Sequence, residues 1–430
     1  MVRGGGIAGG ATVPGSHRVP SGSAAQRIGR LPTLDAVDPS PQHTPDDRCP
    51  GVLRLFPADD GGIARLRFPG GRLRPVDWAA LAAVAADHGG ELHLTSRGNV
   101  QVRGVHDEEL LRRRVDEAGL LPAASHDRVR NLLASPLAGR LSGHTDLGTL
   151  VEDVDAALLE RDELAGLSGR FLLGLDDGGG DVLAHRPDLT AVVHPGQARV
   201  VVAGRDAGVA VAHEDVPGLL ADLAAEFLAR AEGTWRIPGP DEADPRGLAE
   251  AVCARACADT RTEPADPPPP REVAEVPPVG WVDTDDGLVS LLAVTPFGVL
   301  PARLAEFLSA VDRPSTVSAD KAVGLHGLTE GMAEQVVRVL APMGLVFDAA
   351  SPWVRVTACT GRPGCGRSLT DVRYDAADAV AAGTLPVDGP QHWVGCERGC
   401  GWTGRGARVT ATPEGYRVDR PATPSVERTR

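Results

Sequence analysis

Four of the seven cysteines lie in two short groups near the C-terminal end of the sequence. The first group has the spacing C-x5-C and the second has C-x3-C; the residues are Cys359, Cys365, Cys396 and Cys400. Four thiolates that converge on one point can hold a cubane iron–sulfur cluster, and loops rich in small residues let the backbone approach it. Zinc is the rival, but its cysteine pairs usually have two to four intervening residues. The spacing therefore favours an iron–sulfur cluster.

The other three cysteines are interpreted as structural. Cys49 is isolated, and Cys253 and Cys257 lie on an alanine-rich segment predicted to be a helix, where a spacing of four puts both on one face. A buried free cysteine commonly acts as a small hydrophobe. Too few cysteines for a disulfide scaffold, and an odd number of them, fit a reducing compartment, so a cytoplasmic location is expected.

The composition excludes several classes of protein. Apolar residues make up 42% of the 430 residues, and no run of about 18 apolar residues occurs, so a membrane partner is not expected. The net charge of −14 offers no global basic field for nucleic acid. Lys321 is the only lysine, which excludes any mechanism that needs several lysine ammonium groups.

The order of predicted elements indicates an internal duplication. Each lobe shows a strand, a helix, a pair of strands and a helix, followed by a second unit. Gly104 and Gly327 are 223 residues apart, and Arg130 and Arg355 are 225 apart, so the two shifts nearly agree. The predicted parts are a disordered leader (1–48), a first half-domain (49–124) with its second unit (125–257), a proline-rich linker (258–280), and a second half-domain (281–350) with its cluster-binding unit (351–430).

Three more segments, together with the cysteine groups, carry a resemblance. HLTSRGNVQVRGV, RNLLASPLAGR and LSGRFLLGLDDGGGD resemble motifs of the siroheme-dependent nitrite and sulfite reductases and the related precorrin-3B synthases, over most of residues 49–420. The resemblance implies an α+β fold that is internally duplicated. Two ferredoxin-like half-domains and two nitrite/sulfite reductase-type α/β domains would surround one central site.

The same resemblance implies site residues. The four grouped cysteines would be ligands of a [4Fe–4S] cluster, and Cys400 matches the residue that in the reductases also bridges to siroheme iron. Guanidinium groups pair with carboxylates in a planar fork, and siroheme and precorrins carry eight carboxylates. An arginine-lined cavity is therefore expected on an otherwise acidic protein. The residues implied to bind the tetrapyrrole are Arg97, Asn99, Arg103, Arg130 and Arg170, with solvated surface arginines as the alternative interpretation.

One departure distinguishes between members of the family. The reductases have a K-F-K segment that helps to deliver protons, whereas this chain has Arg170-Phe171-Leu172, and arginine is a poor acid. The resemblance therefore favours precorrin-3B synthases, which use dioxygen and electrons from an external donor to hydroxylate precorrin-3A and close a γ-lactone in aerobic cobalamin biosynthesis. A monomer is expected. The alternatives are a siroheme-dependent ferredoxin nitrite or sulfite reductase and an iron–sulfur electron-transfer protein.

Oxygen chemistry in this family also implies a mononuclear non-haem iron. His144 and Asp146 form the one compact H-x-D candidate for its ligands, although Asp146 could equally cap the helix that follows. His126, His326 and His392 are scattered possibilities. Lys321 falls in the second lobe near the turn that corresponds to SRGN in the first, and whether it reaches the cavity is left open.

Overall fold

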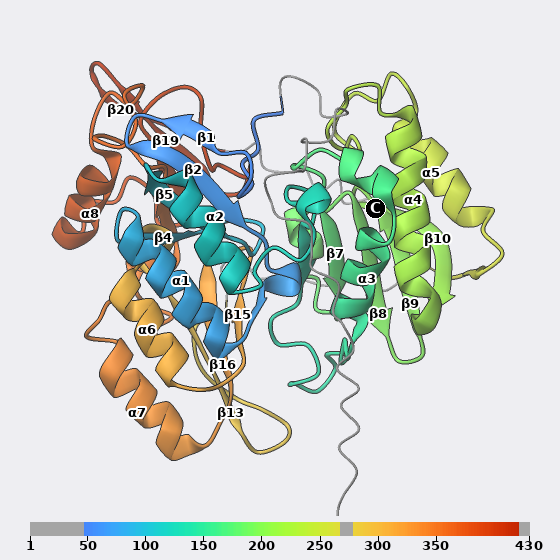
Figure 1. Cartoon of the computed structure of the whole chain (residues 1–430), viewed down its shortest axis with the longest axis horizontal. Helices are drawn as coiled ribbons and strands as arrows, with labels where there is room; N and C mark the ends of the chain where they lie inside the picture. The colour runs from blue at the N-terminus through green and yellow to red at the C-terminus, as the bar shows by residue number, and fades with distance from the viewer. Residues whose placement is uncertain (1–46, 267–277, 421–430) are drawn as a thin grey trace, which may run out of the picture. The chain divides into compact units, whose positions relative to one another are not determined.

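The computed structural model describes residues 47–266 and 278–420. Their fold is mixed α+β, as expected, with four sheets and helices packed against them (Figure 1). The predicted leader, except residues 47 and 48, lies outside the described residues. So does the middle of the predicted linker, while three residues at its start form a short edge strand, β11 (Thr262–Pro264).

The first ferredoxin-like half-domain contains a five-stranded sheet covered by two helices. The strand order is β1 (Phe56–Ala58), β2 (Gly61–Leu66), β5 (Val100–Val105), β4 (Glu91–Leu94), β14 (Val299–Pro301), and the helices are α1 (Pro75–Asp87) and α2 (Glu108–Glu117).

The second half-domain repeats this arrangement. Its strand order is β12 (Gly280–Asp283), β13 (Val289–Val294), β16 (Ala322–Leu328), β15 (Ser315–Val317), β3 (Arg72–Leu73), and its helices are α6 (Ala302–Ala310) and α7 (Glu330–Leu340).

The two half-domains exchange their edge strands. β3 comes from the first repeat and pairs with β15 of the second, whereas β14 comes from the second repeat and pairs with β4 of the first. Helices α1 and α6 also pack together, and one hydrophobic core runs through both half-domains. The exchange therefore fixes the two repeats against each other.

The two remaining sheets share a second repeated pattern. Three parallel strands are followed by an antiparallel neighbour, as β6-β7-β8 with β9 in one sheet and β17-β18-β19 with β20 in the other. The larger sheet contains β6 (Leu132–Ala134), β7 (Leu173–Asp176), β8 (Leu189–His194), β9 (Gln197–Val202), β10 (Arg205–Ala212) and β11, with helices α3 (Leu150–Leu159), α4 (Val216–Arg230) and α5 (Leu248–Cys257). The smaller contains β17 (Val356–Ala358), β18 (Gln391–Val394), β19 (Ala407–Thr412) and β20 (Gly415–Asp419), with helix α8 (Val372–Ala382).

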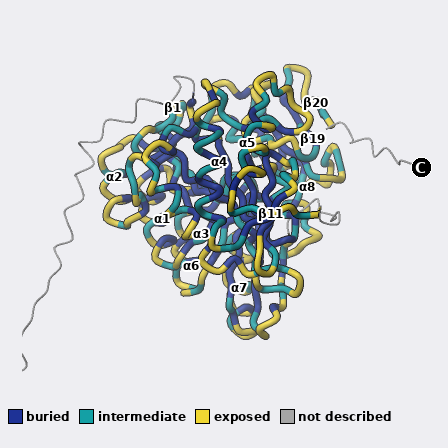
Figure 2. The backbone as a smooth tube through the Cα atoms, turned by 90° about the vertical axis from the view of Figure 1, so that its right-hand side faces the viewer, coloured by how far each residue is buried: buried dark blue, intermediate teal, exposed yellow. Residues whose placement is uncertain are grey.

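Backbone geometry confirms the duplication. Gly104 in β5 and Gly327 in β16 both have φ 69°, a left-handed value that favours glycine. The antiparallel pairs β2–β5 and β13–β16 both contain a register shift at the same place. The strands are mostly buried, while α2 and α7 expose one side (Figure 2). Among the residues described, no helix is long and apolar enough to cross a membrane.

Candidate functional site

A cavity of about 970 Å³ is bounded by the first half-domain on one side and by both cysteine groups on the other. Small-molecule sites usually have volumes of about 300–1,000 Å³, so this one lies at the upper end of that range. Its walls come from the 48–65 segment, strands β4 and β5, and the loops that follow β17 and β18. The cavity is therefore large enough to be considered for a macrocyclic ligand.

One wall of the cavity is the polar face of the first sheet. Arg65, Gln101 and His93 are direct neighbours across β2, β5 and β4, and all three line the cavity. The Arg65 Nη2 donates a hydrogen bond of 3.1 Å to the Gln101 Oε1. Val100 and Val102 point to the opposite face and are fully buried in the core. Alternation along the strands thus places polar side chains on the face toward the cavity and apolar side chains on the face toward the core.

The grouped cysteines follow the ends of neighbouring parallel strands. Cys359 comes directly after β17, and Cys396 comes two residues after β18. Because the carboxyl ends of parallel strands meet at one edge of a sheet, the two loops converge. All four cysteines, Cys359, Cys365, Cys396 and Cys400, are free and line the same cavity.

The thiol environments fit an iron–sulfur cluster. Burial raises the pKa of Cys359 and of Cys400, and the other grouped thiols raise each of these pKa values further. When several thiols lie close together, their negatively charged thiolate forms repel one another. Iron ions would supply the positive charge that stabilises the thiolates. The amide N of Gly395 donates to the Cys359 Sγ at 3.4 Å. Such amide donors are typical of iron–sulfur sites.

Small residues and one histidine shape the cluster loops. A Cβ at Gly395 would lie 1.7 Å from the Ser368 Oγ, so only glycine fits there. The His392 Nε2 donates to the carbonyl of Cys400 at 3.0 Å, while its Nδ1 accepts from the Thr357 hydroxyl at 2.8 Å. Burial lowers the pKa of His392 to about 4, so the ring is neutral. His392 thus holds the Cys400 loop and lies outside the cavity lining.

Two charged side chains of the first half-domain bond to the backbone of the first cysteine loop. Arg103 forms a two-pronged pair with Asp60 at 2.8 and 2.9 Å, and its Nη2 also donates to the Gly364 carbonyl at 3.0 Å. The Asp59 Oδ2 accepts from the amide N of Gly366 at 2.6 Å. Arg103, implied above as a tetrapyrrole ligand, lines the cavity with its charge already paired.

The cavity lining is strongly cationic. Asp59 is its only acidic side chain among the described residues, against nine basic ones. The basic residues are Arg48, Arg54, Arg65, Arg97, Arg103, Arg367, Arg373, Arg398 and Lys321. Within the described chain only Arg103 of this set pairs with a carboxylate. The expected arginine-lined cavity on an acidic protein is present, and it has the charge to bind a polyanion.

Arg97 is the sequence-predicted residue whose charge is most available. It lines the cavity, its Nε is buried without a partner, and burial lowers its pKa to about 10. A buried guanidinium without a carboxylate partner is costly unless an anion binds it. The geometry therefore places Arg97 where an anionic ligand would complete its hydrogen bonding.

The other three predicted tetrapyrrole residues lie outside the cavity lining. Asn99 is fully buried and bonds the Asn131 side chain at 3.0 Å. Arg130 is buried in a two-pronged pair with Asp155 at 2.6 and 2.8 Å. Arg170 is exposed, with its guanidinium 4.3 Å from the ring centre of Trp235. Their tetrapyrrole role remains a prediction from resemblance.

His144 and Asp146 are not brought together as a metal site. The His144 Nδ1 bonds the Asp177 Oδ2 at 2.8 Å, whereas the exposed Asp146 accepts from the Gly148 amide N in its own loop. Neither residue lines the cavity, so this pair does not fit a mononuclear iron beside it. His126 and His326 likewise bond neighbouring hydroxyl groups rather than each other.

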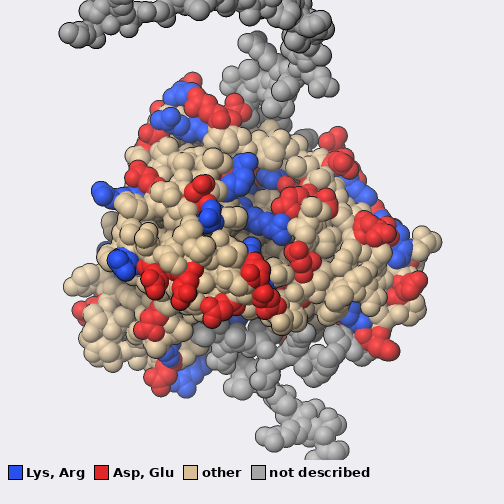
Figure 3. Space-filling view, turned by 90° about the horizontal axis from the view of Figure 1, so that it is seen from below, with Lys and Arg blue, Asp and Glu red and all other residues tan. Residues whose placement is uncertain are grey.

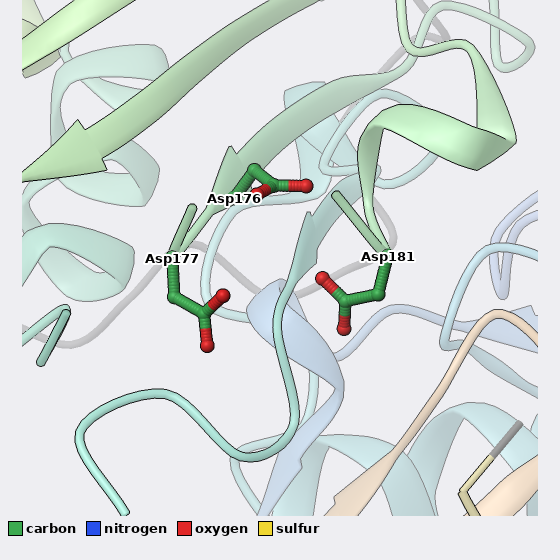
Figure 4. Close-up of side chains that lie close together, drawn as sticks. All are labelled: Asp176, Asp177 and Asp181. Carbon is green, nitrogen blue, oxygen red and sulfur yellow. The ribbon is translucent and has the colours of Figure 1, made fainter. Parts of the chain in front are cut away.

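An acidic cluster lies next to His144 at the end of β7. The carboxyl groups of Asp176, Asp177 and Asp181 face one another within 4.8 Å (Figure 4). Asp176 accepts hydrogen bonds from four backbone amides, and Asp181 bonds the Ser135 hydroxyl at 2.5 Å. Burial, followed by the two neighbouring carboxylates, raises the pKa of Asp181 to about 6, although the Ser135 bond lowers it in part.

Asp181→Asn is expected to stabilise the protein at neutral pH. Because the folded-state pKa is about 6 and the ordinary value is 3.8, the folded state holds the extra proton between these values. The free energy of unfolding therefore falls as pH rises from about 4 through 6, by about 1–3 kcal/mol at most. The asparagine amide does not titrate, so the variant should not lose stability in this pH range, and its side-chain oxygen can still accept the Ser135 hydrogen bond. Denaturant unfolding at pH 5 and 7.5 measures the free energy of unfolding of both proteins. An equal pH dependence in wild type and variant would contradict the prediction. Asp241→Asn, at an exposed position, is the control.

The corresponding sheet face of the second repeat differs from the cavity wall. The row that corresponds to Arg65, Gln101 and His93 is Leu292, Gly324 and Thr316. A pocket of only about 30 Å³ is present there, lined in part by Leu292, Ala319 and Ala322. This row of the sheet therefore carries charged side chains in the first repeat only, and the large cavity lies on that side.

Several cavity residues were not predicted from the sequence. Cys49, interpreted as a buried hydrophobe, is indeed buried, yet it lines the cavity and its Sγ accepts from the Arg65 Nη1 at 3.2 Å. Arg65 and His93 could have been found from strand alternation once the packing face was assigned. Arg373, on α8, had no sequence signal because only the docking of the two domains brings it to His93.

The outer surface contrasts with the cavity. On the face shown in Figure 3, Asp and Glu side chains surround a central hollow in which Lys and Arg side chains gather. The whole chain has a formal net charge of −14. Local concentration of basic groups in a hollow, against this background, favours anionic ligands over anionic surfaces.

Comparisons with known proteins agree with this architecture. Residues 57–112 match the family described as nitrite/sulfite reductase ferredoxin-like half domain. The solved structure of the Mycobacterium tuberculosis NirA protein has a similar fold, with a TM-score of 0.63 and 18% sequence identity, over 78% of this chain and 68% of that one. A comparison with curated proteins found no significant match. The nitrite/sulfite reductase-like fold expected from the motifs is thereby confirmed.

Proposed function

We propose that the chain is an oxidoreductase of tetrapyrrole chemistry, a precorrin-3B synthase that hydroxylates precorrin-3A and closes its γ-lactone. The observation that carries the proposal is the single cavity that unites four free cysteines with eight arginines and one lysine. A polycarboxylate macrocycle needs many guanidinium groups and a large volume, and both are available here. An electron carrier would need only the cysteines.

Each part of the cavity has a role in this proposal. Cys359, Cys365, Cys396 and Cys400 would hold a [4Fe–4S] cluster, which when bound supplies single electrons. Arg97 and Arg65, from the first half-domain, would bind substrate carboxylates and fix the orientation of the macrocycle. In the overall reaction one oxygen atom enters the product and the other leaves as water, which consumes two electrons and two protons. We infer that an external donor supplies the electrons.

The segment at the K-F-K position supports hydroxylation over anion reduction. Arg170 stacks on Trp235 and Leu172 is buried among apolar side chains, so neither lines the cavity. Reduction of nitrite or sulfite takes up many protons, which acidic groups near the anion must deliver. The segment provides no such group in this chain.

One observation favours the alternative, a siroheme-dependent nitrite or sulfite reductase. Lys321 lines the cavity from the second repeat, so one ammonium group is present after all. Siroheme would then occupy the volume that the substrate occupies in the first proposal, beside Cys400. Both proposals require the same cysteines and the same arginines, so only the bound tetrapyrrole and the reaction distinguish them.

Anaerobic purification followed by tetrapyrrole extraction, iron analysis and EPR separates the candidates. We expect about four iron atoms per chain for the cluster and about one more for the mononuclear iron, no siroheme, and conversion of precorrin-3A, dioxygen and reductant to a product one oxygen atom heavier. Extractable siroheme with reduction of nitrite or sulfite would establish the alternative. A fully loaded cluster with no hydroxylactone and no siroheme would overturn both.

A further inference from the structure

Lys321 occupies a backbone position where the first repeat has glycine. It lies in the turn between β15 and β16 with φ 63°, and its counterpart Gly98, between β4 and β5, has the same φ. The two turns also share their hydrogen bonds, from Lys321 to the Ser318 carbonyl and from Gly98 to the Thr95 carbonyl. Residues other than glycine rarely adopt this left-handed conformation, and such strain persists mainly at functional sites.

The strained turn is held from two other domains. Asp320 lies 3.5 Å from the His185 Nε2, in the segment after β7, and 3.4 Å from the Arg405 Nη1, in the loop before β19. The amide N of Ser318 also bonds the Ala322 carbonyl at 2.9 Å. The backbone of Lys321 is therefore fixed by contacts that do not involve its own side chain.

The side chain of Lys321 passes through a gap left by Gly298 and lines the cavity. A Cβ at Gly298 would lie 2.7 Å from the Lys321 Cδ, so a larger residue would block this path. Burial, together with the nearby Arg373, lowers the pKa of Lys321 to about 8, although the thiol of Cys359 raises it in part. These neighbours place the ammonium group on the cysteine side of the cavity.

Within the described residues the Lys321 ammonium group has no hydrogen-bond or ion-pair partner. Arg373, its cationic neighbour, donates to the Cys359 carbonyl at 3.2 Å and to the His93 Nδ1 at 3.4 Å. Burial together with nearby cations lowers the pKa of His93 to about 3, so that ring is neutral. Glu91 lies 3.9 Å from the His93 Nε2 and interacts with Arg373, whereas no carboxylate among the described residues pairs with Lys321. The lysine contributes no contact that would explain the strain of its backbone.

We propose that the Lys321 ammonium group binds a carboxylate of the tetrapyrrole on the cysteine side of the cavity, opposite the arginine face of the first half-domain. Lys321 is then a ligand-binding residue that the second repeat supplies to the site of the first. This proposal depends on the proposed function for the nature of the ligand. It explains the single lysine of the chain, its unpartnered charge and its glycine-like backbone through one role.

Binding of uroporphyrin III, an octacarboxylate tetrapyrrole, to the anaerobically purified protein tests this role. We expect Lys321→Asn to weaken binding about tenfold and to flatten its salt dependence, because one charge-assisted contact is lost. Asparagine tolerates the left-handed conformation, so the melting temperature should not fall. Lys321→Arg should restore most of the affinity.

Arg186→Asn is the matched control, because Arg186 is a basic residue with φ 49° that lies outside the cavity lining. It should bind uroporphyrin like wild type. If Lys321→Asn also binds within twofold of wild type with its iron content intact, the role of Lys321 is refuted while tetrapyrrole binding stands. If wild type itself does not bind uroporphyrin, the proposed function and this inference fall together.

Discussion

Cys396→Ala is expected to abolish the iron–sulfur cluster, whereas Cys253→Ala should leave it intact. Cys396 lies in the loop after β18 and lines the cavity with the three other grouped cysteines. A cubane cluster needs four protein ligands, and this chain has no fifth thiol in the group to replace a lost one. The iron of the cluster, its visible absorption and its EPR signal after reduction should all disappear in the first variant.

Cys253 is a matched control because it is a free, half-buried thiol on a different element. It packs on α5 against the core of the larger sheet and lies outside the cavity lining. Removing its Sγ changes packing only slightly, so its iron content should equal that of wild type. Cys49→Ala extends the comparison, because Cys49 lines the cavity without belonging to the group. Retention of the cluster iron in Cys396→Ala, or its loss in Cys253→Ala, would contradict the ligand assignment.

The duplication could be predicted from sequence because both repeats have the same local order of strand and helix patterns. The spacing of Gly104 and Gly327 indicated two equivalent strand positions, and the order of strands and helices indicated two half-domains. The exchange of β3 and β14 between the sheets could not be predicted. These strands have two and three residues. A segment this short has no residue pattern that determines which of two similar sheet edges it pairs with.

The convergence of the four grouped cysteines on one cavity was predictable for a similar reason, while the rest of the cavity lining was only partly so. The spacing of the cysteines is a local property of the sequence. Whether an arginine is free to bind a ligand depends instead on which side chain lies opposite it in the folded chain. Arg103 and Arg130 look alike in sequence, yet Asp60 and Asp155 already neutralise them. Arg97 has no such partner among the described residues. Only three-dimensional pairing separates arginines that hold the fold together from those left free for a ligand.

The double variant Arg65→Met/Arg97→Met is expected to weaken uroporphyrin III binding about 100-fold or more. Both guanidinium groups line the cavity without a carboxylate partner, and each charge-assisted bond to a ligand carboxylate contributes about 1.5–3 kcal/mol. Methionine keeps the length and apolar stem of the side chain, so the cavity wall should remain packed. Calorimetric titration at several salt concentrations should show a weaker affinity together with a shallower salt dependence.

Arg170→Met provides the discriminating comparison, since sequence resemblance assigns Arg170 to the tetrapyrrole whereas the structure places it on Trp235. If the cavity binds the macrocycle, this variant should bind uroporphyrin like wild type. A large loss in Arg170→Met with little loss in the double variant would mean that the tetrapyrrole lies outside the cavity. Equal losses in both would mean that the macrocycle extends from the cavity to the Trp235 surface, with Arg65 and Arg97 at one end only.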